Sequence, residues 1–190
     1  GEYSALSCSG CVNFSDTIKI LKMRGEAMQN AVPKGIGGMV AILGTDIDKI
    51  ENLLEKNEDN FNIQIANDNS DGQIVVSGKL NDLEKFQEIL KSLNIKNIKL
   101  PVSAPFHCEL MSKATQRMKE EIKKTSFIKG NNILMSNVTA NKVTETSEIK
   151  DLLIKQIESR VRWREIVINM INSGVDNFIE IGPGKVLSGL

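Results

Sequence analysis

Short apolar runs and helically spaced apolar positions alternate along this chain, and their order predicts its elements. Between residues 36 and 102, runs bounded by turn-forming residues predict strands, and the amphipathic stretches between them predict helices. The expected strands are residues 39–43, 61–66, 73–77 and 95–102, and the expected helices are residues 46–56 and 81–92. This βαββαβ order predicts a ferredoxin-like unit over residues 36–102.

The remainder of the chain also alternates between the two patterns. The expected helices are residues 16–32, 110–122, 148–158 and 164–172, and the expected strands are residues 133–138 and 177–181. Alternating strands and helices are typical of a parallel sheet covered by helices. The sequence therefore predicts an α/β fold, with a parallel-sheet core formed by residues 1–35 and 103–190 and an inserted subdomain formed by residues 36–102.

The first long helix, expected to be capped by Ser15 or Asp16, carries a cation on its apolar side. At about 100° per residue, Arg24 falls between Met28 and Ala31, away from the polar arc of the helix. A guanidinium that faces the interior is costly unless it meets an anion. Arg24 therefore has either an internal carboxylate partner or a bound anionic ligand.

The single histidine of the chain lies at an expected junction between a strand and a helix. Pro101 and Pro105 disfavour helical backbone before His107, and Leu110 begins the next helical periodicity. Amide groups at the start of a helix would disfavour the imidazolium and keep the ring neutral, which is the form that a general base needs. The alternative is a loop histidine with no chemical task.

Charge and composition narrow the classes of partner. Lysine plus arginine and aspartate plus glutamate number 24 each, so the chain has no net field that would gather nucleic acid or an anionic membrane. The expected central strands also lack the aromatic residues that stack on RNA bases. No apolar run approaches the roughly 18 residues of a membrane span, and the N-terminus lacks the regions of a signal peptide. Together with three cysteines, these features predict a cytoplasmic protein that binds neither nucleic acid nor membrane.

Six segments spread over the whole chain match one family in their residues and in their order. They are GEYSAL at 1–6, MRGEAMQ at 23–29, NSDGQIVVSG at 69–78, PVSAPFHCELM at 101–111, VRW at 161–163 and EIGPGKVLSGL at 180–190. Together they make the chain similar to the malonyl-CoA:acyl carrier protein transacylases of fatty acid synthesis. The resemblance implies a hydrolase-like α/β core, and this family also carries an inserted ferredoxin-like unit.

The resemblance implies a two-step acyl transfer. A serine would take the malonyl group from malonyl-CoA and pass it to the phosphopantetheine thiol of acyl carrier protein, with no cofactor or metal. By its position in the motif, His107 would be the base and acid partner of that serine. A monomer is the oligomeric state that the resemblance leads us to expect.

Four further residues take roles by position in the family motifs. Arg24 would grip the malonyl carboxylate through two parallel hydrogen bonds, and Met28, one turn further along the helix, would contact the bound acyl group. Gln156 would line the pocket and help to orient His107, and its alternative is an exposed helical glutamine. Phe106 resembles the bulky residue that would crowd an α-methyl group, a contact worth only ~1–3 kcal/mol of discrimination.

The nucleophile is the point at which the chain departs from the family. The family serine lies in a GxSxG turn, and Gly1 matches the last glycine of that motif, so the serine would lie two residues upstream. Ser4 would lie one turn into the helix and point away from the turn. We therefore expect the 190 residues themselves to be inactive in acyl transfer. The alternative function is a non-catalytic module that binds the carrier protein or coenzyme A.

Overall fold

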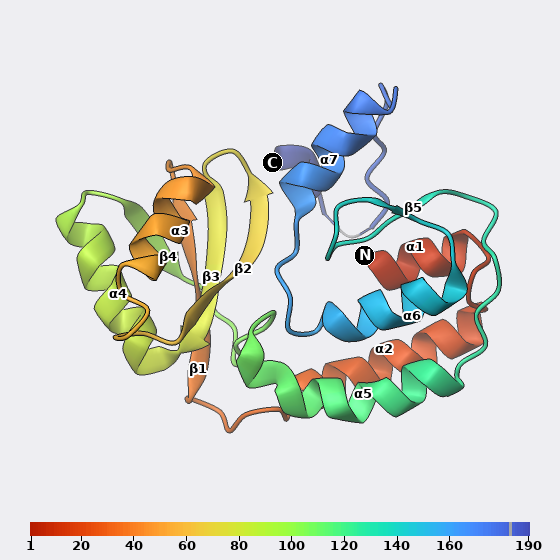
Figure 1. Cartoon of the computed structure of the whole chain (residues 1–190), viewed down its shortest axis with the longest axis horizontal. Coiled ribbons are helices and arrows are strands. Elements are labelled where there is room, and N and C mark those ends of the chain that lie inside the picture. The colour runs from red at the N-terminus through yellow and green to blue at the C-terminus, as the bar shows by residue number, and fades with distance from the viewer. Residues whose placement is uncertain (183) are drawn as a thin grey trace.

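The computed structural model of the chain describes residues 1–182 and 184–190, and its elements form a sheet-containing part and a helical part (Figure 1). The elements of the sheet-containing part are β1 (Gly37–Leu43), α3 (Ile47–Glu55), β2 (Ile63–Ser70), β3 (Gln73–Lys79), α4 (Leu80–Ser92) and β4 (Lys96–Lys99). Their strands are ordered β2-β3-β1-β4, and each neighbouring pair is antiparallel. The βαββαβ order of these elements is the one that the sequence predicts.

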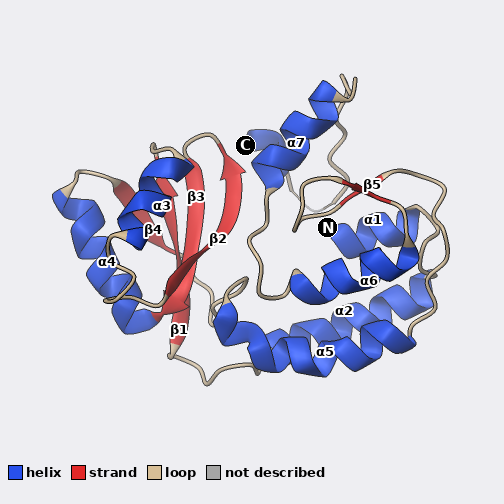
Figure 2. Cartoon of the chain, in the orientation of Figure 1, coloured by secondary structure: helices blue, strands red, loops and turns tan. Residues whose placement is uncertain are grey.

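Helices α3 and α4 cover one face of this sheet, where alternate strand residues point inward (Figure 2). The tight turn from β2 to β3 places Gly72 at a φ of +82°, which glycine adopts without steric cost. A Cβ atom at Gly78 would lie 2.5 Å from the carbonyl oxygen of Asn62, so this position also requires glycine. The buried residues of this core are Val40, Ile42, Ile50, Ile63, Ile74, Val76, Leu83, Phe86, Leu90 and Ile95.

The helical part is built from chain segments on both sides of the sheet-containing part. Its elements are α1 (Glu2–Cys8), α2 (Phe14–Gln29), η1 (Glu109–Met111), α5 (Ser112–Lys124), β5 (Leu134–Met135), β6 (Lys142–Val143) and α6 (Thr146–Lys155), followed by α7 (Trp163–Asn172) and η2 (Leu187–Gly189). The N-cap of α2 is Asn13, whose side chain accepts a hydrogen bond from the backbone N–H of Asp16, so the predicted caps were wrong. Among the helices of the described chain, none has the length and apolar character needed to cross a membrane.

Apolar residues of α1, α2, α5 and α6 meet in a second core, separate from that of the sheet. Helices α2 and α6 both pack against α5, so residues far apart in sequence line the same interior (Figure 1). The most deeply buried members of this core are Leu6, Ile20, Met111, Ala114, Met118, Ile122, Leu153 and Ile157.

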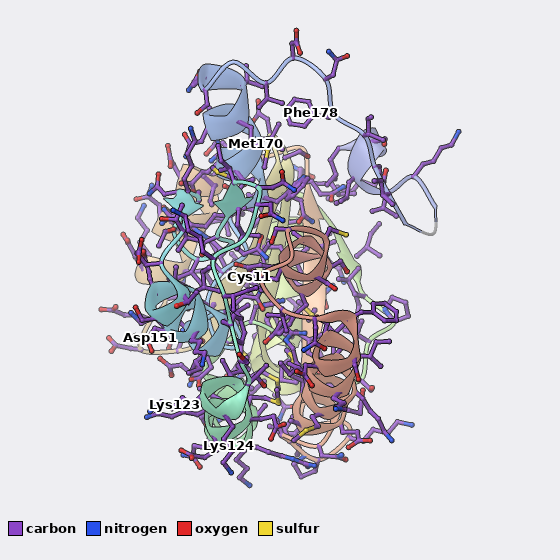
Figure 3. All side chains as sticks on the ribbon, turned by 90° about the vertical axis from the view of Figure 1, so that its right-hand side faces the viewer. Cys11, Lys123, Lys124, Asp151, Met170 and Phe178 are labelled. Atoms are coloured by element: carbon purple, nitrogen blue, oxygen red, sulfur yellow. The ribbon has the colours of Figure 1, made fainter. Side chains whose placement is uncertain are left out.

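Two predicted strands of the parallel sheet are not formed as expected. Of residues 133–138, only Leu134–Met135 is a strand, and it pairs antiparallel with Lys142–Val143. Residues 177–181 form no strand, and Ile179 and Ile181 are 83% and 93% exposed. Figure 3 shows Phe178 on the chain beyond α7. A strand needs a neighbouring strand to bond its backbone, and in the described chain residues 177–181 make no backbone hydrogen bond to another segment.

The two parts are joined where the segment before α7 meets the edge strand β2. Val161 donates its backbone N–H to the carbonyl of Ala66 at 2.8 Å, and its carbonyl accepts from the N–H of Asp68 at 2.9 Å. The fully buried carboxylate of Asp68 is also bound by Arg164 of α7, with Nη2 and Oδ2 2.9 Å apart. These contacts fix the chain between α6 and α7 against the sheet.

Candidate functional site

His107 lies just before η1 with its backbone at a φ of +59°, which is uncommon for a residue with a side chain. Its Nδ1 atom is 2.9 Å from the backbone carbonyl oxygen of Gln156. A carbonyl oxygen can only accept, so Nδ1 carries the proton of the neutral ring and Nε2 is left unprotonated. Gln156 is the C-cap of α6, where backbone carbonyls lack partners within the helix. The end of α6 therefore sets the tautomer of His107.

Burial lowers the pKa of His107 to about 4, and the positive charge of Arg24 adds to this effect. The carbonyl of Gln156 opposes the shift without cancelling it. The ring is therefore neutral at neutral pH, as the sequence predicts, but the predicted cause was wrong. A 3₁₀ turn, η1, separates His107 from the start of α5. The largest cause of the lowered pKa is the removal of the ring from water.

Arg24 of α2 is half-buried and has no carboxylate partner within salt-bridge distance in the described chain. Its Nη2 donates to the side-chain oxygen Oε1 of Gln156 at 3.0 Å, and its guanidinium lies 5.7 Å from the ring centre of Tyr3. Its Nε is buried and has no hydrogen-bond partner among the residues that the structure describes. Of the two predicted alternatives, the internal salt bridge is not formed, which leaves a buried cation whose charge is not neutralised.

Gln156 connects these two residues, and its side chain is 4% exposed. Its backbone carbonyl accepts from His107 Nδ1, and its Oε1 accepts from Arg24. Its Nε2 donates to Oε2 of Glu2 at 2.6 Å. The exposed helical glutamine considered from the sequence is therefore wrong, and a single buried residue holds both the predicted base and the predicted carboxylate-binding residue.

Sequence reasoning missed Glu2 as part of this group. Glu2 is 7% exposed, and its Oε2 also accepts from Nδ2 of Asn137 at 2.9 Å. Glu2 stands next to the chain start and Gln156 lies 154 residues later, so no local pattern links them. A clue was available in the helical pattern, because Glu2 precedes the buried positions Tyr3 and Leu6 of α1.

The two remaining predicted residues lie close by without joining the hydrogen-bonded group. Met28 is 3% exposed and is part of the helical core, one turn beyond Arg24. Phe106 packs against that core and also against a small apolar cluster of Met39, Ala66 and Val75 on the sheet. Contact of either residue with an acyl group stays a prediction.

A cavity of about 590 Å³ opens beside His107, at the junction of the two parts. Glu51, Glu55 and Glu158 give its wall an acidic character, which Arg160 partly offsets through an ion pair to Glu51 at 2.7 Å. The other lining residues are Leu54, Gln64, Ile65 and Ser159. This cavity provides space for a small molecule next to the imidazole.

Comparison with known proteins gives a consistent set of relatives. The family model "Acyl transferase domain" matches residues 1–188. Over 192 residues the chain is 44% identical to the malonyl CoA-acyl carrier protein transacylase of Bacillus subtilis (strain 168), covering 100% of this chain and 61% of that protein. It is 38% identical over 191 residues to the corresponding transacylase of Salmonella typhimurium, of which it covers 62%.

Solved structures agree with this comparison. The crystal structure of the malonyl CoA-acyl carrier protein transacylase from Clostridium perfringens superposes with a TM-score of 0.96 at 48% identity, over 100% of this chain and 60% of that one. A type II PKS acyl-carrier protein in complex with its malonyl-transacylase gives a TM-score of 0.96 at 34% identity, over 100% of this chain and 62% of that one. The chain thus has the mixed α/β fold of these enzymes and spans about 61% of the length of the Bacillus relative. Since the acyl transferase model covers residues 1–188, this chain belongs to the acyl transferase domain family.

Proposed function

We propose that this chain carries the general base and the carboxylate-binding residue of a malonyl-CoA:acyl carrier protein transacylase that acts in fatty acid synthesis. The observation that carries the proposal is the bridge made by Gln156, which accepts from Arg24 through its side chain and from His107 through its backbone. A cation without a carboxylate partner and a neutral imidazole are thereby held around one residue. These are the two groups needed to hold a malonyl thioester and to activate a hydroxyl beside it.

In the proposed reaction, His107 transfers one proton in each of the two half-reactions. Nε2 takes the proton of a serine hydroxyl as its oxygen attacks the malonyl thioester, and the imidazolium then protonates the departing thiolate of coenzyme A. In the second half, Nε2 takes the proton of the carrier-protein thiol and returns it to the serine oxygen. The bond from Nδ1 to the Gln156 carbonyl keeps the ring oriented throughout. We expect the serine outside these 190 residues, which contain no GxSxG sequence.

Arg24 selects the acyl group in this proposal. Its Nε has no protein partner and its Nη2 is bonded to a neutral amide, so its charge is available to a carboxylate in a two-bond arrangement. Phe106 would crowd an α-methyl group, and Met28 would contact the acyl chain from the core side. No cofactor or metal takes part in the proposed reaction.

The assembled enzyme is proposed as a cytoplasmic monomer that meets acyl carrier protein. Its hydrolase-like core includes residues 1–35 and 103–190, with residues 36–102 as the ferredoxin-like insertion. The antiparallel β2-β3-β1-β4 order supports the insertion. The likeness to a carrier protein complex supports the partner.

Calorimetric titration of the chain with malonyl-CoA and with acetyl-CoA tests the proposal. The two ligands differ in one carboxylate, so we expect wild type to bind malonyl-CoA at least about tenfold more tightly, the size of one hydrogen bond to a charged group. Arg24→Gln should remove this difference while leaving the affinity for acetyl-CoA unchanged. Equal affinities in wild type would contradict the proposal.

A second candidate is a non-catalytic module that binds the carrier protein or coenzyme A. It is favoured by one observation: no serine hydroxyl bonds the imidazole of His107 in the described chain, where its partner is the Gln156 carbonyl. The candidate predicts equal binding of malonyl-CoA and acetyl-CoA and no effect of Arg24→Gln. The titration above therefore separates the two functions.

A further inference from the structure

Glu2 is a buried carboxylate surrounded by hydrogen-bond donors. Its Oε2 accepts from Gln156 Nε2 at 2.6 Å and from Asn137 Nδ2 at 2.9 Å. A hydrogen bond from the backbone of Asn137 also favours the charged form. An ionised carboxylate can accept from all of these groups at once. An amide at this position would have one accepting oxygen and one donating NH₂ group in place of two accepting oxygens.

The carboxylate also decides which way the amide of Gln156 faces. An amide has a donating end and an accepting end. Because Glu2 accepts, the Nε2 end of Gln156 must face it, and the Oε1 end is left to accept from Arg24 Nη2 at 3.0 Å. If the amide were reversed, Nε2 of Gln156 would face Nη2 of Arg24, and both of these groups are hydrogen-bond donors. Glu2, which can only accept, and Arg24, which can only donate, therefore favour the same polarity of the Gln156 amide.

Burying the carboxylate of Glu2 destabilises the fold, because the charged group loses its hydration. Glu2 is 7% exposed, and this burial raises the pKa of its carboxyl group. No salt bridge to Glu2 is seen within residues 1–182 and 184–190. If the side chain of Glu2 served only to fill space, a neutral residue of similar shape would pack equally well without this cost.

We propose that Glu2 is a positioning residue, which sets the orientation of the Gln156 amide and thereby holds Arg24 in the geometry that binds a carboxylate. This inference rests on the proposed function, because it assigns Arg24 to the substrate carboxylate. Glu2 itself touches neither the substrate nor the reacting atoms; it acts through Gln156.

The test uses Glu2→Gln in the full 190-residue chain. The first measurement is rotation of the Arg24 guanidinium, followed by ¹⁵N NMR exchange between its two Nη signals and assigned with Arg24→Lys. We expect rotation to be restricted in wild type and faster in Glu2→Gln, because the new amide can donate as well as accept and no longer requires Nε2 of Gln156 to face it. The second measurement is the ratio of malonyl-CoA to acetyl-CoA affinity, which should fall about tenfold in the variant, as expected for weakened bonding to a charged group.

A matched control separates positioning from loss of stability. Asp68→Asn also neutralises a buried carboxylate, but its partner is Arg164 and not Gln156. We expect Asp68→Asn to keep the restricted rotation of Arg24, because the ion pair of Asp68 is with Arg164 and does not involve Gln156. Equal release of Arg24 in both variants would mean that general loosening is the cause, and the proposal would be wrong.

A double variant covers the case in which Glu2→Gln does not fold. Glu2→Gln with Gln156→Glu reverses the polarity, because position 2 then donates and position 156 accepts from both sides. Rotation of Arg24 should be restricted again, although the new carboxylate would block the substrate site. Free rotation in the double variant, or wild-type rotation in Glu2→Gln, would overturn the proposal. If wild type shows no preference for malonyl-CoA, the proposed function fails, while the rotation measurement still decides the role of Glu2.

Discussion

Removal from water controls the chemistry of the individual residues at this site. His107 loses hydration and so keeps a neutral ring, with its pKa lowered to about 4. Arg24 keeps its charge despite burial, since a guanidinium does not deprotonate in proteins. The two groups meet at Gln156, which offers one oxygen to each. Each residue therefore has the protonation state that the proposed transfer of a malonyl group requires.

The pKa of His107 can be read directly, because the chain has one histidine. In a ¹H NMR titration we expect its ring signal to stay at the neutral position from pH 8 down to about pH 5 and to reach its midpoint near pH 4. Burial of the imidazole is the physical reason. A midpoint at the ordinary value of 6.5 would show that the ring is solvated and would contradict the site described above.

The same shift predicts how stability changes with pH. His107 binds its proton more weakly in the folded chain, with a pKa of about 4 against 6.5, so the unfolded chain takes up more protons between these values. Its contribution is complete above pH 6.5 and is lost as the pH falls toward 4, amounting to about 2 kcal/mol less stability at pH 5 than at pH 7. Urea unfolding of wild type and His107→Asn should differ by this amount in their pH dependence. Identical pH dependence would contradict the burial of the ring.

At the scale of elements, the described structure depends on the contact between β2 and the start of α7. Asp68 is fully buried and accepts from Arg164, while the backbone of Val161 continues the hydrogen bonding of β2. The chain between α6 and α7 includes Ser159 and Arg160, which line the cavity beside His107. This contact therefore shapes the surroundings of the imidazole as well as joining the two parts.

Asp68→Asn should destabilise the chain strongly. The change weakens hydrogen bonds from Arg164 to a charged group, which contribute about 1.5–3 kcal/mol. Urea unfolding followed by the fluorescence of Trp163, the single tryptophan, measures the loss. Glu26→Gln serves as the control, because its pair with Arg117 is exposed and 3.8 Å long, and we expect a change below about 0.5 kcal/mol. Equal effects of the two variants would contradict the anchoring role of Asp68.

The elements differed in how far the sequence could predict them. The βαββαβ region was predicted well, because its strands pair with neighbours inside one short stretch and their alternation is a local signal. Residues 177–181 have the composition of a strand, yet they remain exposed, because a strand also requires a partner that local pattern cannot supply. The same dependence on distant partners limits how much of the candidate site the sequence could predict. The helical wheel placed Arg24 on the apolar side, whereas the contact between Glu2 and Gln156 joins residues 154 positions apart.

At the scale of the whole molecule, a charged ligand has to be recognised by individual side chains near it. Positive and negative residues number 24 each, so no long-range field draws in an anionic thioester, and the charge that matters is that of Arg24 within the fold. The sheet-containing part and the helical part each have their own apolar core, and His107 lies where they meet. The proposed function therefore depends on how the two parts are held together as much as on the site residues.

The chain by itself should not become acylated. In the described structure the imidazole of His107 bonds a backbone carbonyl and no serine hydroxyl, and Ser4 is an exposed residue of α1. After incubation with malonyl-CoA, intact-mass measurement should find the unmodified mass of the chain. A stable malonyl adduct that disappears in His107→Asn would show that these 190 residues contain a working nucleophile and would contradict this part of the account.

The central claim is that Arg24 and His107 serve the same bound acyl group, and one NMR titration tests it directly. Malonyl-CoA is added to the chain while the Nε–H signal of Arg24 and the ring signal of His107 are followed together. We predict that both signals move with one shared dissociation constant and that acetyl-CoA leaves the Arg24 signal in place. Movement of one signal without the other on adding malonyl-CoA would contradict the claim.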